Sequence, residues 1–168
     1  NAIVADGYRL LKVDTLDNRS ITERIVVNLC EEIASTKSDV VVFSDFRHGL
    51  FNRDTIPPLI DAIPENALRV ADSQVASRWG NILEFKDFDL ITPNEREARF
   101  ALGDQDSVVR PLATELHRQA NCNVLILKLG DRGLITHRIR PDGDPRTFYG
   151  IDSFAEHVED AVGAGDAL

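Results

Sequence analysis

The sequence predicts an α/β domain built on a largely parallel β-sheet. Two observations support this class. Segments with strand spacing alternate with segments of helical spacing along the chain, and the strand segments are short apolar runs that end in polar residues or glycine. A chain of 168 residues, 43% hydrophobic and 28% charged, is long enough and apolar enough for one globular domain with a hydrophobic core.

The first segments set the alternation. Residues 8–13 have strand character, and residues 20–36 repeat apolar positions at helical spacing, with Ser20 and Glu23 three apart as in a capping box. Residues 40–43 are continuously apolar (VVVF), which predicts a strand buried on both faces.

In the middle of the chain, Asn52 is placed to cap a helix that runs to about residue 63, although Pro57 and Pro58 fall in its first turns. Strands are then expected over residues 68–71 and 88–91.

The last third continues the pattern with residues 94–102 as a helix closed by Gly103, and residues 111–120 as a second helix. Residues 123–129 (NVLILKL) give the strongest strand signal in the chain. Two more strands, at 133–139 and 147–149, are expected to pair antiparallel at the edge of the sheet.

Charge and hydropathy exclude two classes of partner. The formal net charge of −9 argues against a basic face that follows a nucleic-acid backbone, although backbone amides and a metal ion can still neutralise the phosphates of a nucleotide. No run of about 20 apolar residues is present, so no membrane span is expected. The first seven residues have neither a basic start nor an apolar signal core, and we expect a cytoplasmic protein.

Polar residues follow the apolar strand runs at four places. Asp45, Asp72 and Asn94 each come at or just after a strand, and Gly130 follows the strongest one. In open α/β sheets the ligand crevice lies outside the carboxyl ends of the strands, so these residues are expected on one rim, with Asp45 and Asp72 as candidate substrate contacts. Asp and Asn also cap helices and start turns, and that structural explanation stays open for each of them.

The tail of the chain carries the most specific pattern. Gly163, Ala164 and Gly165 have almost no side chain, so their amides could approach an anion closely if a helix begins there. Asp166 follows directly, where a carboxylate could accept a proton from a hydroxyl that attacks a phosphoryl group. A turn of small residues with an Asp cap is the alternative explanation.

These residues resemble the D-T-x-G-A-G-D signature of the ribokinase, or PfkB, family of sugar kinases. Three other stretches fit the family in the same order: T-P-N-E-R-E at 92–97 is similar to T-P-N-x-x-E, L-G-D-R-G at 129–133 to L-G-x-x-G, and S-D-F-R-H-G at 44–49 to the S-D-Y-x-K-G of its heptose-phosphate kinase branch. The resemblance covers roughly residues 39–168 and implies a ribokinase-like fold, a mostly parallel sheet between two helical layers, present here as an incomplete domain.

For the reaction, the resemblance implies an ATP-dependent kinase that phosphorylates a hydroxyl of a sugar or sugar phosphate. Asp166 would be the catalytic base, and residues 163–165 would form the anion hole. The resemblance also implies that residues 1–16 end a small β lid with its linker, that residues 39–168 are the nucleotide-binding core, and that the full-length protein forms a homodimer.

For the cofactors, the resemblance implies Mg²⁺ positioned through water by Asn94 and Glu97, and nucleotide approach at Gly130 and Gly133. Asp160 would help to organise a metal or monovalent-cation site. Lys128 could reach a phosphate or could simply end a strand, and Asn94 with Glu97 also has the spacing of a capping box.

The sequence departs from the family pattern at Ala161, where the signature has Thr, and at Phe46, Arg47 and His48, where the heptose-kinase stretch has Tyr and later Lys. These departures leave open a non-catalytic nucleotide-binding or regulatory domain of the same fold, and a nucleoside or ketosugar kinase remains a neighbouring alternative. A dehydrogenase-type dinucleotide domain is disfavoured because no G-x-G-x-x-G follows a strand.

Overall fold

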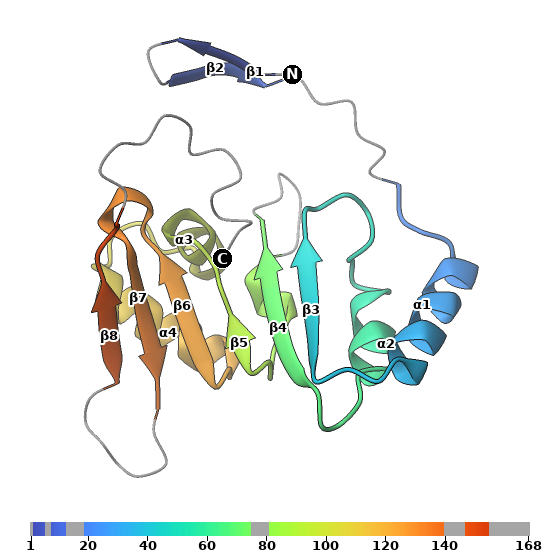
Figure 1. Ribbon diagram of the computed structural model, residues 1–168. Coiled ribbons are helices and arrows are strands. Elements are labelled where there is room, and N and C mark those ends of the chain that lie inside the picture. The colour runs from blue at the N-terminus through green and yellow to red at the C-terminus, as the bar shows by residue number, and fades with distance from the viewer. Residues whose placement is uncertain (1, 6–7, 13–18, 75–80, 140–146, 155–168) are drawn as a thin grey trace.

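A computed structural model describes residues 2–5, 8–12, 19–74, 81–139 and 147–154, with side chains from residue 19 onward (Figure 1). The main sheet has six strands in the order β3-β4-β5-β6-β7-β8. The first four run parallel and the last two pairings are antiparallel. The strands are β3 (Val40–Asp45), β4 (Leu68–Ser73), β5 (Leu90–Ile91), β6 (Val124–Lys128), β7 (Leu134–Arg138) and β8 (Phe148–Ile151). The predicted α/β class, the mostly parallel sheet and its antiparallel edge are confirmed.

Within the described ranges, four α-helices and two short 3-10 helices connect the strands: α1 (Glu23–Ser35), α2 (Ile56–Asp61), η1 (Ile82–Glu84), α3 (Glu95–Leu102), α4 (Val109–Ala120) and η2 (Gly130–Arg132). A separate antiparallel hairpin, β1 (Ala2–Ala5) with β2 (Tyr8–Lys12), lies in Figure 1 on the side toward which β3, β4 and β6 point. None of the helices in the described ranges is long and apolar enough to cross a membrane.

The hydrophobic core lies on one face of the sheet. The buried strand side chains that share this face pack against α2, α3, α4 and η1, and they are Phe43, Ala71, Ile91, Leu125 and Leu127. The aromatic rings of Phe43, Phe85 and Phe88 meet edge to face at 5.6–6.0 Å between centroids, a favourable geometry for aromatic pairs.

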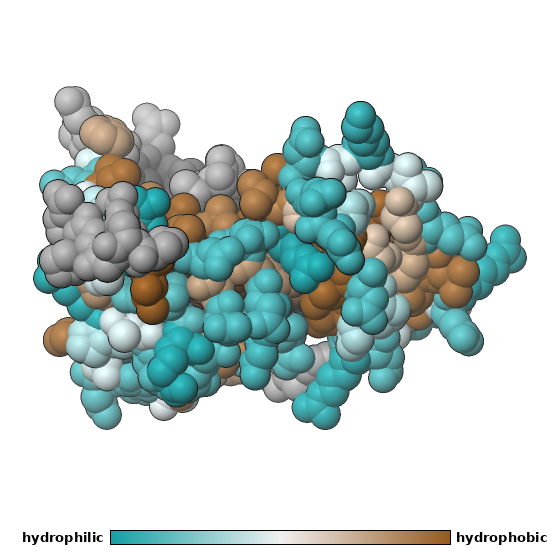
Figure 2. All heavy atoms as spheres, turned by 90° about the horizontal axis from the view of Figure 1, so that it is seen from below, coloured by the Kyte–Doolittle hydropathy of each residue, from teal (hydrophilic) through white to brown (hydrophobic). Residues whose placement is uncertain are grey.

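The opposite face of the sheet, which we call the open face, is not buried among the described residues. Along β3 the exposure alternates, so that Phe43 is 3% exposed and Val42 is 58% exposed. Leu68 on β4, which pairs with Val40, is 55% exposed. Figure 2 shows apolar atoms between the charged side chains at the end of the molecule where these strands begin. The expectation that residues 40–43 are buried on both faces is therefore wrong, because β3 is an edge strand with one helical layer behind it.

Two predicted helix starts also need correction. The first helix begins at Glu23 rather than near Ser20, and no side chain caps it, so the predicted capping box does not form. Asn52 does not cap α2. Its Oδ1 accepts hydrogen bonds from the backbone N–H groups of Asp54 and Thr55, which makes a turn that precedes the helix. Pro57 and Pro58 then occupy the first turn, where no backbone donor is required.

A matched pair on β3 tests the sidedness of the sheet. We expect Phe43→Ala to lower the free energy of unfolding by roughly 3–5 kcal/mol, because a buried ring leaves a cavity. Val42→Ala should change it by less than about 1 kcal/mol, since that side chain is already largely in water. Urea denaturation of the 168-residue chain measures both, and equal losses would contradict a one-sided core.

Candidate functional site

The candidate site lies at the edge of the sheet where the parallel strands end, which we call the rim. Asp45 is the last residue of β3, Asp72 is the penultimate residue of β4, and Lys128 is the last residue of β6. Asn94 follows β5 and pairs with Lys128 in an isolated parallel bridge. The topology thus brings together four residues that are far apart in the sequence, as the parallel-sheet argument predicted for Asp45, Asp72 and Asn94.

Asp72 connects three of these strand ends. Its Oδ1 accepts hydrogen bonds from the hydroxyl of Thr92 and from Nζ of Lys128, both at 3.0 Å. The Lys128 and Asp72 side chains are 15% and 24% exposed, so the ion pair is partly shielded from water. The sequence placed Asp72 and Lys128 separately, and it gave no signal that they pair or that Thr92 joins them.

Asn94 and Glu97 form a complete capping box at the start of α3. Oδ1 of Asn94 accepts from the backbone N–H of Glu97 at 2.8 Å, and Oε2 of Glu97 accepts from the backbone N–H of Asn94 at 2.7 Å. The helix ends at Gly103, whose φ of 64° is left-handed, so both predicted ends of this helix are confirmed.

Glu97 is 8% exposed and carries its carboxylate into the rim. Desolvation raises the pKa of Glu97 above its ordinary value, and the nearby charge of Asp72 adds to this. The Asn94 N–H and the Lys128 ammonium oppose the rise. A buried carboxylate close to a second one favours a cation beside it.

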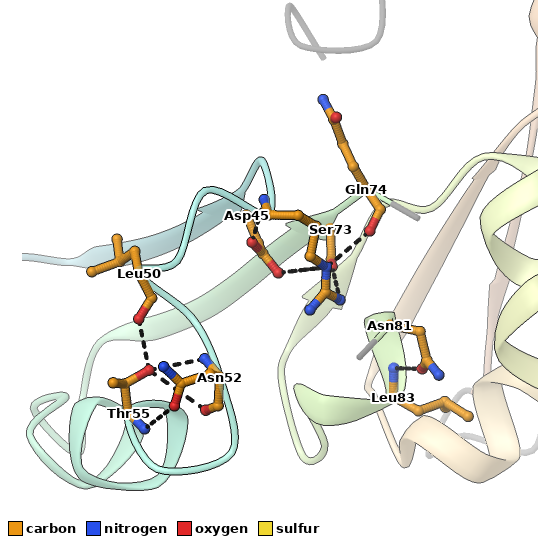
Figure 3. Close-up of polar contacts among 9 residues, drawn as sticks. Asp45, Leu50, Asn52, Thr55, Ser73, Gln74, Asn81 and Leu83 are labelled. Carbon is orange, nitrogen blue, oxygen red and sulfur yellow. Dashed lines mark hydrogen bonds and ion pairs between the residues drawn. The ribbon is translucent and has the colours of Figure 1, made fainter. Parts of the chain in front are cut away.

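The end of β3 holds a second polar cluster (Figure 3). Oδ2 of Asp45 accepts from the hydroxyl of Ser73 at 3.2 Å and lies 3.0 Å from Nε of Arg47. The Arg47 guanidinium also donates to Ser73 Oγ at 2.6 Å and to the backbone carbonyl of Gln74 at 3.0 Å. The sequence interpretation treated Arg47 only as a departure from a motif. The one available signal was a cation two residues after a strand-end aspartate.

The turn after β6 contains the two predicted glycines, and they differ. Gly130 has φ +65°, and a Cβ there would meet nothing within 4 Å. Gly133 has φ +83°, and a Cβ would lie 2.0 Å from the backbone oxygen of Ile151. The fold itself therefore requires glycine at 133. An ion pair between Arg132 and Glu95 connects this turn to the first turn of α3.

The remaining predicted site residues are Asp160, Gly163, Ala164, Gly165 and Asp166, and all lie outside the described residues.

The rim offers possible ligands for the Mg²⁺ that the resemblance implies. The available donors are carboxylate and amide oxygens, which this hard cation prefers, at Asp72, Asn94 and Glu97. No group of three or more His, Cys, Asp or Glu side chains in the described ranges could hold a metal directly. The donor set therefore fits an ion that keeps several of its waters, not a closed protein cage.

Comparison with known proteins identifies the family. The sequence profile described as pfkB family carbohydrate kinase matches residues 31–168. The chain belongs to the pfkB family.

Two curated relatives are both described as bifunctional protein HldE. The protein from Sulfurimonas denitrificans is 22% identical over 99% of this chain and 34% of its own length, and that from Bradyrhizobium sp. is 22% identical over 90% and 29%. The chain thus spans about a third of the length of these relatives.

Solved pfkB-type structures show the same fold. Phosphofructokinase-2 from Escherichia coli in complex with potassium superposes with a TM-score of 0.71 at 18% identity, over 95% of this chain and 50% of that one. Ribokinase from Giardia lamblia gives 0.64 at 19% identity, over 89% and 45%. The predicted ribokinase-like fold is confirmed. This chain spans about half the length of each of these two structures.

The two glycines of the turn should respond differently to a methyl group. We expect Gly130→Ala to cost roughly 1–2 kcal/mol of unfolding free energy, the usual cost of a left-handed conformation for a residue with a Cβ. Gly133→Ala should cost distinctly more, because its Cβ overlaps backbone atoms of residues 151–153 that cannot rotate away. Denaturant unfolding of the two variants compares them, and a smaller loss for Gly133→Ala would refute the steric argument.

Proposed function

We propose that the protein containing this chain is an ATP-dependent carbohydrate kinase that transfers the γ-phosphoryl group to a hydroxyl of a sugar or sugar phosphate. The observation that carries the proposal is the rim itself, where Asp72, Asn94, Glu97 and Lys128 meet at the carboxyl ends of parallel strands. The match to the pfkB profile extends over this rim and over residues 160–166.

The proton and the developing charge are assigned to the tail. Asp166 accepts the proton of the attacking hydroxyl, and the amides of residues 163–165 stabilise the charge on the transferred phosphoryl group. Asp160 is proposed to support a metal or monovalent-cation site nearby. These roles rest on the sequence of residues 160–166.

The phosphates are assigned to the β5–β6 side of the rim. Asn94 and Glu97 would hold Mg²⁺ through water, and this ion would neutralise charge on the nucleotide phosphates. Lys128 already points at Asp72 and supplies a positive charge next to them. Gly130 leaves the turn open, with nothing within 4 Å of its Cβ position, so a nucleotide can approach its backbone.

The acceptor side is assigned to Asp45 and Asp72 at the ends of β3 and β4. The hairpin β1–β2 is proposed as the end of a lid, with residues 1–16 as lid and linker and residues 39–168 as the nucleotide-binding core. The HldE relatives support the heptose-phosphate branch, and a cytoplasmic homodimer is part of the proposal.

One sequence feature favours a second candidate, a non-catalytic nucleotide-binding domain of the same fold. Ala161 stands where the family signature has Thr, so one hydroxyl is missing beside the anion hole. A parent protein that binds Mg-ATP but transfers no phosphoryl group would support this candidate.

The decisive experiment replaces Asp166 with Asn in the full-length parent protein. We expect phosphoryl transfer to fall by at least about 100-fold, because a positioned base contributes that much or more, while Mg-ATP binding stays within a few-fold. Transfer is measured by coupled ADP release and binding by calorimetry. The 168-residue chain alone serves as a low-activity control, since positioning needs both substrates held in line. Undiminished turnover in the variant would remove Asp166 from the role of base.

Glu97→Gln separates the function of this residue from its structural role. Glutamine keeps an oxygen that can accept the Asn94 N–H but loses the charge. Because the folded pKa of Glu97 is raised, its protonated form is the stabilising one, and this contribution is lost as pH rises through the folded pKa. At neutral pH the variant should thus be at least as stable as the wild type, yet need more Mg²⁺ for half-maximal activity.

A Mg²⁺ titration at fixed ATP, with thermal unfolding of the same samples, measures the two effects of Glu97→Gln. The control is Glu115→Gln, which removes an exposed charge from α4. An unchanged Mg²⁺ requirement would leave Glu97 with capping alone.

A further inference from the structure

Arg47 lies in the turn that follows β3, on the opposite side of the rim from the proposed phosphate site. Its φ of +61° is left-handed, a conformation that a residue with a long side chain adopts at a cost of about 1–2 kcal/mol. Its backbone N–H donates to Asp45 Oδ1 at 2.8 Å, which returns the chain toward the ends of β3 and β4. The turn therefore directs the guanidinium back to the rim instead of into solvent.

The guanidinium is held along one edge. Nε faces Asp45 Oδ2 and the Gln74 carbonyl, and Nη2 donates to Ser73 Oγ (Figure 3). The hydrogen bonds and the ion pair of this side chain among the described residues use Nε and Nη2, not Nη1. A guanidinium carries five N–H donors in a rigid plane, so this anchoring fixes the plane and leaves donors on its other edge for a further acceptor.

Burial makes the arrangement costly for stability alone. The Arg47 and Asp45 side chains are only 10% and 1% exposed, and desolvation lowers the pKa of Arg47 and raises that of Asp45. A buried ion pair is seldom more stabilising than apolar side chains of the same size. A fixed, shielded donor edge is what recognition of an anion requires.

The position on the sheet separates this donor from the nucleotide. The start of α3 and the turn at 130–133 lie at β5 and β6, whereas Arg47 follows β3. Two strand spacings separate β3 from β5 and three separate it from β6, roughly 10 Å and roughly 14 Å. An anion at Arg47 therefore belongs to the second substrate. The carboxylates whose charges act on Arg47 are Asp45, Glu84 and Glu97, and they would repel that anion without a local cation.

We propose that Arg47 binds the phosphate group of a phosphorylated acceptor and so selects sugar phosphates over free sugars. This inference rests on the proposed kinase function and adds to it a specificity residue. Asp45, Ser73 and the Gln74 carbonyl act as positioning groups that hold the guanidinium plane.

The test uses the full-length parent protein and pairs of acceptors, fructose 6-phosphate with fructose and a heptose phosphate with the free heptose. We expect Arg47→Gln to raise KM for the phosphorylated member by about 10- to 100-fold, the loss of one charge-assisted contact. KM for ATP and for the free sugar should stay within a few-fold. Arg47→Lys should fall between, because it keeps the charge without the fork.

Two variants protect the interpretation. Arg47→Gln leaves Asp45 buried without its partner, so Arg47→Lys, which keeps a positive charge beside Asp45 but loses the planar fork, carries the test if Arg47→Gln unfolds. Arg69→Gln removes the same charge from β4 four residues before Ser73 and should leave the acceptor preference unchanged.

The outcomes are distinct. If the wild type phosphorylates free sugars and discriminates against their phosphates, the inference about Arg47 is wrong but the kinase proposal stands. The same conclusion follows if Arg47→Gln changes KM equally for both members of a pair, or if it changes the KM for ATP. A wild type without any transfer refutes the kinase proposal, and calorimetry with inorganic phosphate and fructose 6-phosphate then decides Arg47 alone. If Arg47→Gln weakens the binding of these two compounds, the inference is supported. If their binding is unchanged in the variant, the inference is overturned.

Discussion

The site depends most on one oxygen atom, Oδ1 of Asp72. Strand ends lose the ladder of backbone hydrogen bonds that fixes the middle of a sheet, so side chains must hold them in register. Asp72 does this for three strands, since its Oδ1 accepts from Thr92 after β5 and from Lys128 on β6. The contact also places the Lys128 ammonium close enough to Glu97 to oppose the rise in the pKa of that carboxylate. The geometry and charge of the rim thus share one cause.

Local chemistry explains which features the sequence could predict. The Asn94–Glu97 cap and the left-handed Gly103 are set by residues within nine positions of one another, and both formed as expected. The strand ends could be predicted because polarity changes there. The burial of residues 40–43 depended on what covers each face of the sheet, which no short pattern contains, and Val42 is exposed while Phe43 is buried. Arg47 was missed because its partners Ser73 and Gln74 lie 26 and 27 residues away.

Several rim residues could serve both the fold and a ligand, and the structure distinguishes the two roles at some of these positions better than at others. Gly133 is required by contact with the backbone after β8, so its presence alone says nothing about a nucleotide. Gly130 has space around it and is limited only by its φ, which leaves room for a ligand. The capping bonds of Glu97 would form equally well with glutamine, so capping explains the length of the side chain but not its charge.

The charge of Glu97 is therefore the feature that most needs a functional explanation. At neutral pH a buried carboxylate with a raised pKa reduces the stability of the fold, and the neighbouring Asp72 increases that cost. A cation that enters the rim reverses the sign of this interaction, because it favours the ionised form that burial disfavours. Under the proposed function, a chain with a net charge of −9 could then accept anionic substrates, since cations held at fixed points, such as Lys128 and Arg47, would neutralise the field where the phosphates are proposed to bind. The carboxylates that lower the stability of the fold, Glu97 and Asp72, are therefore the same groups that would attract a cation to the rim.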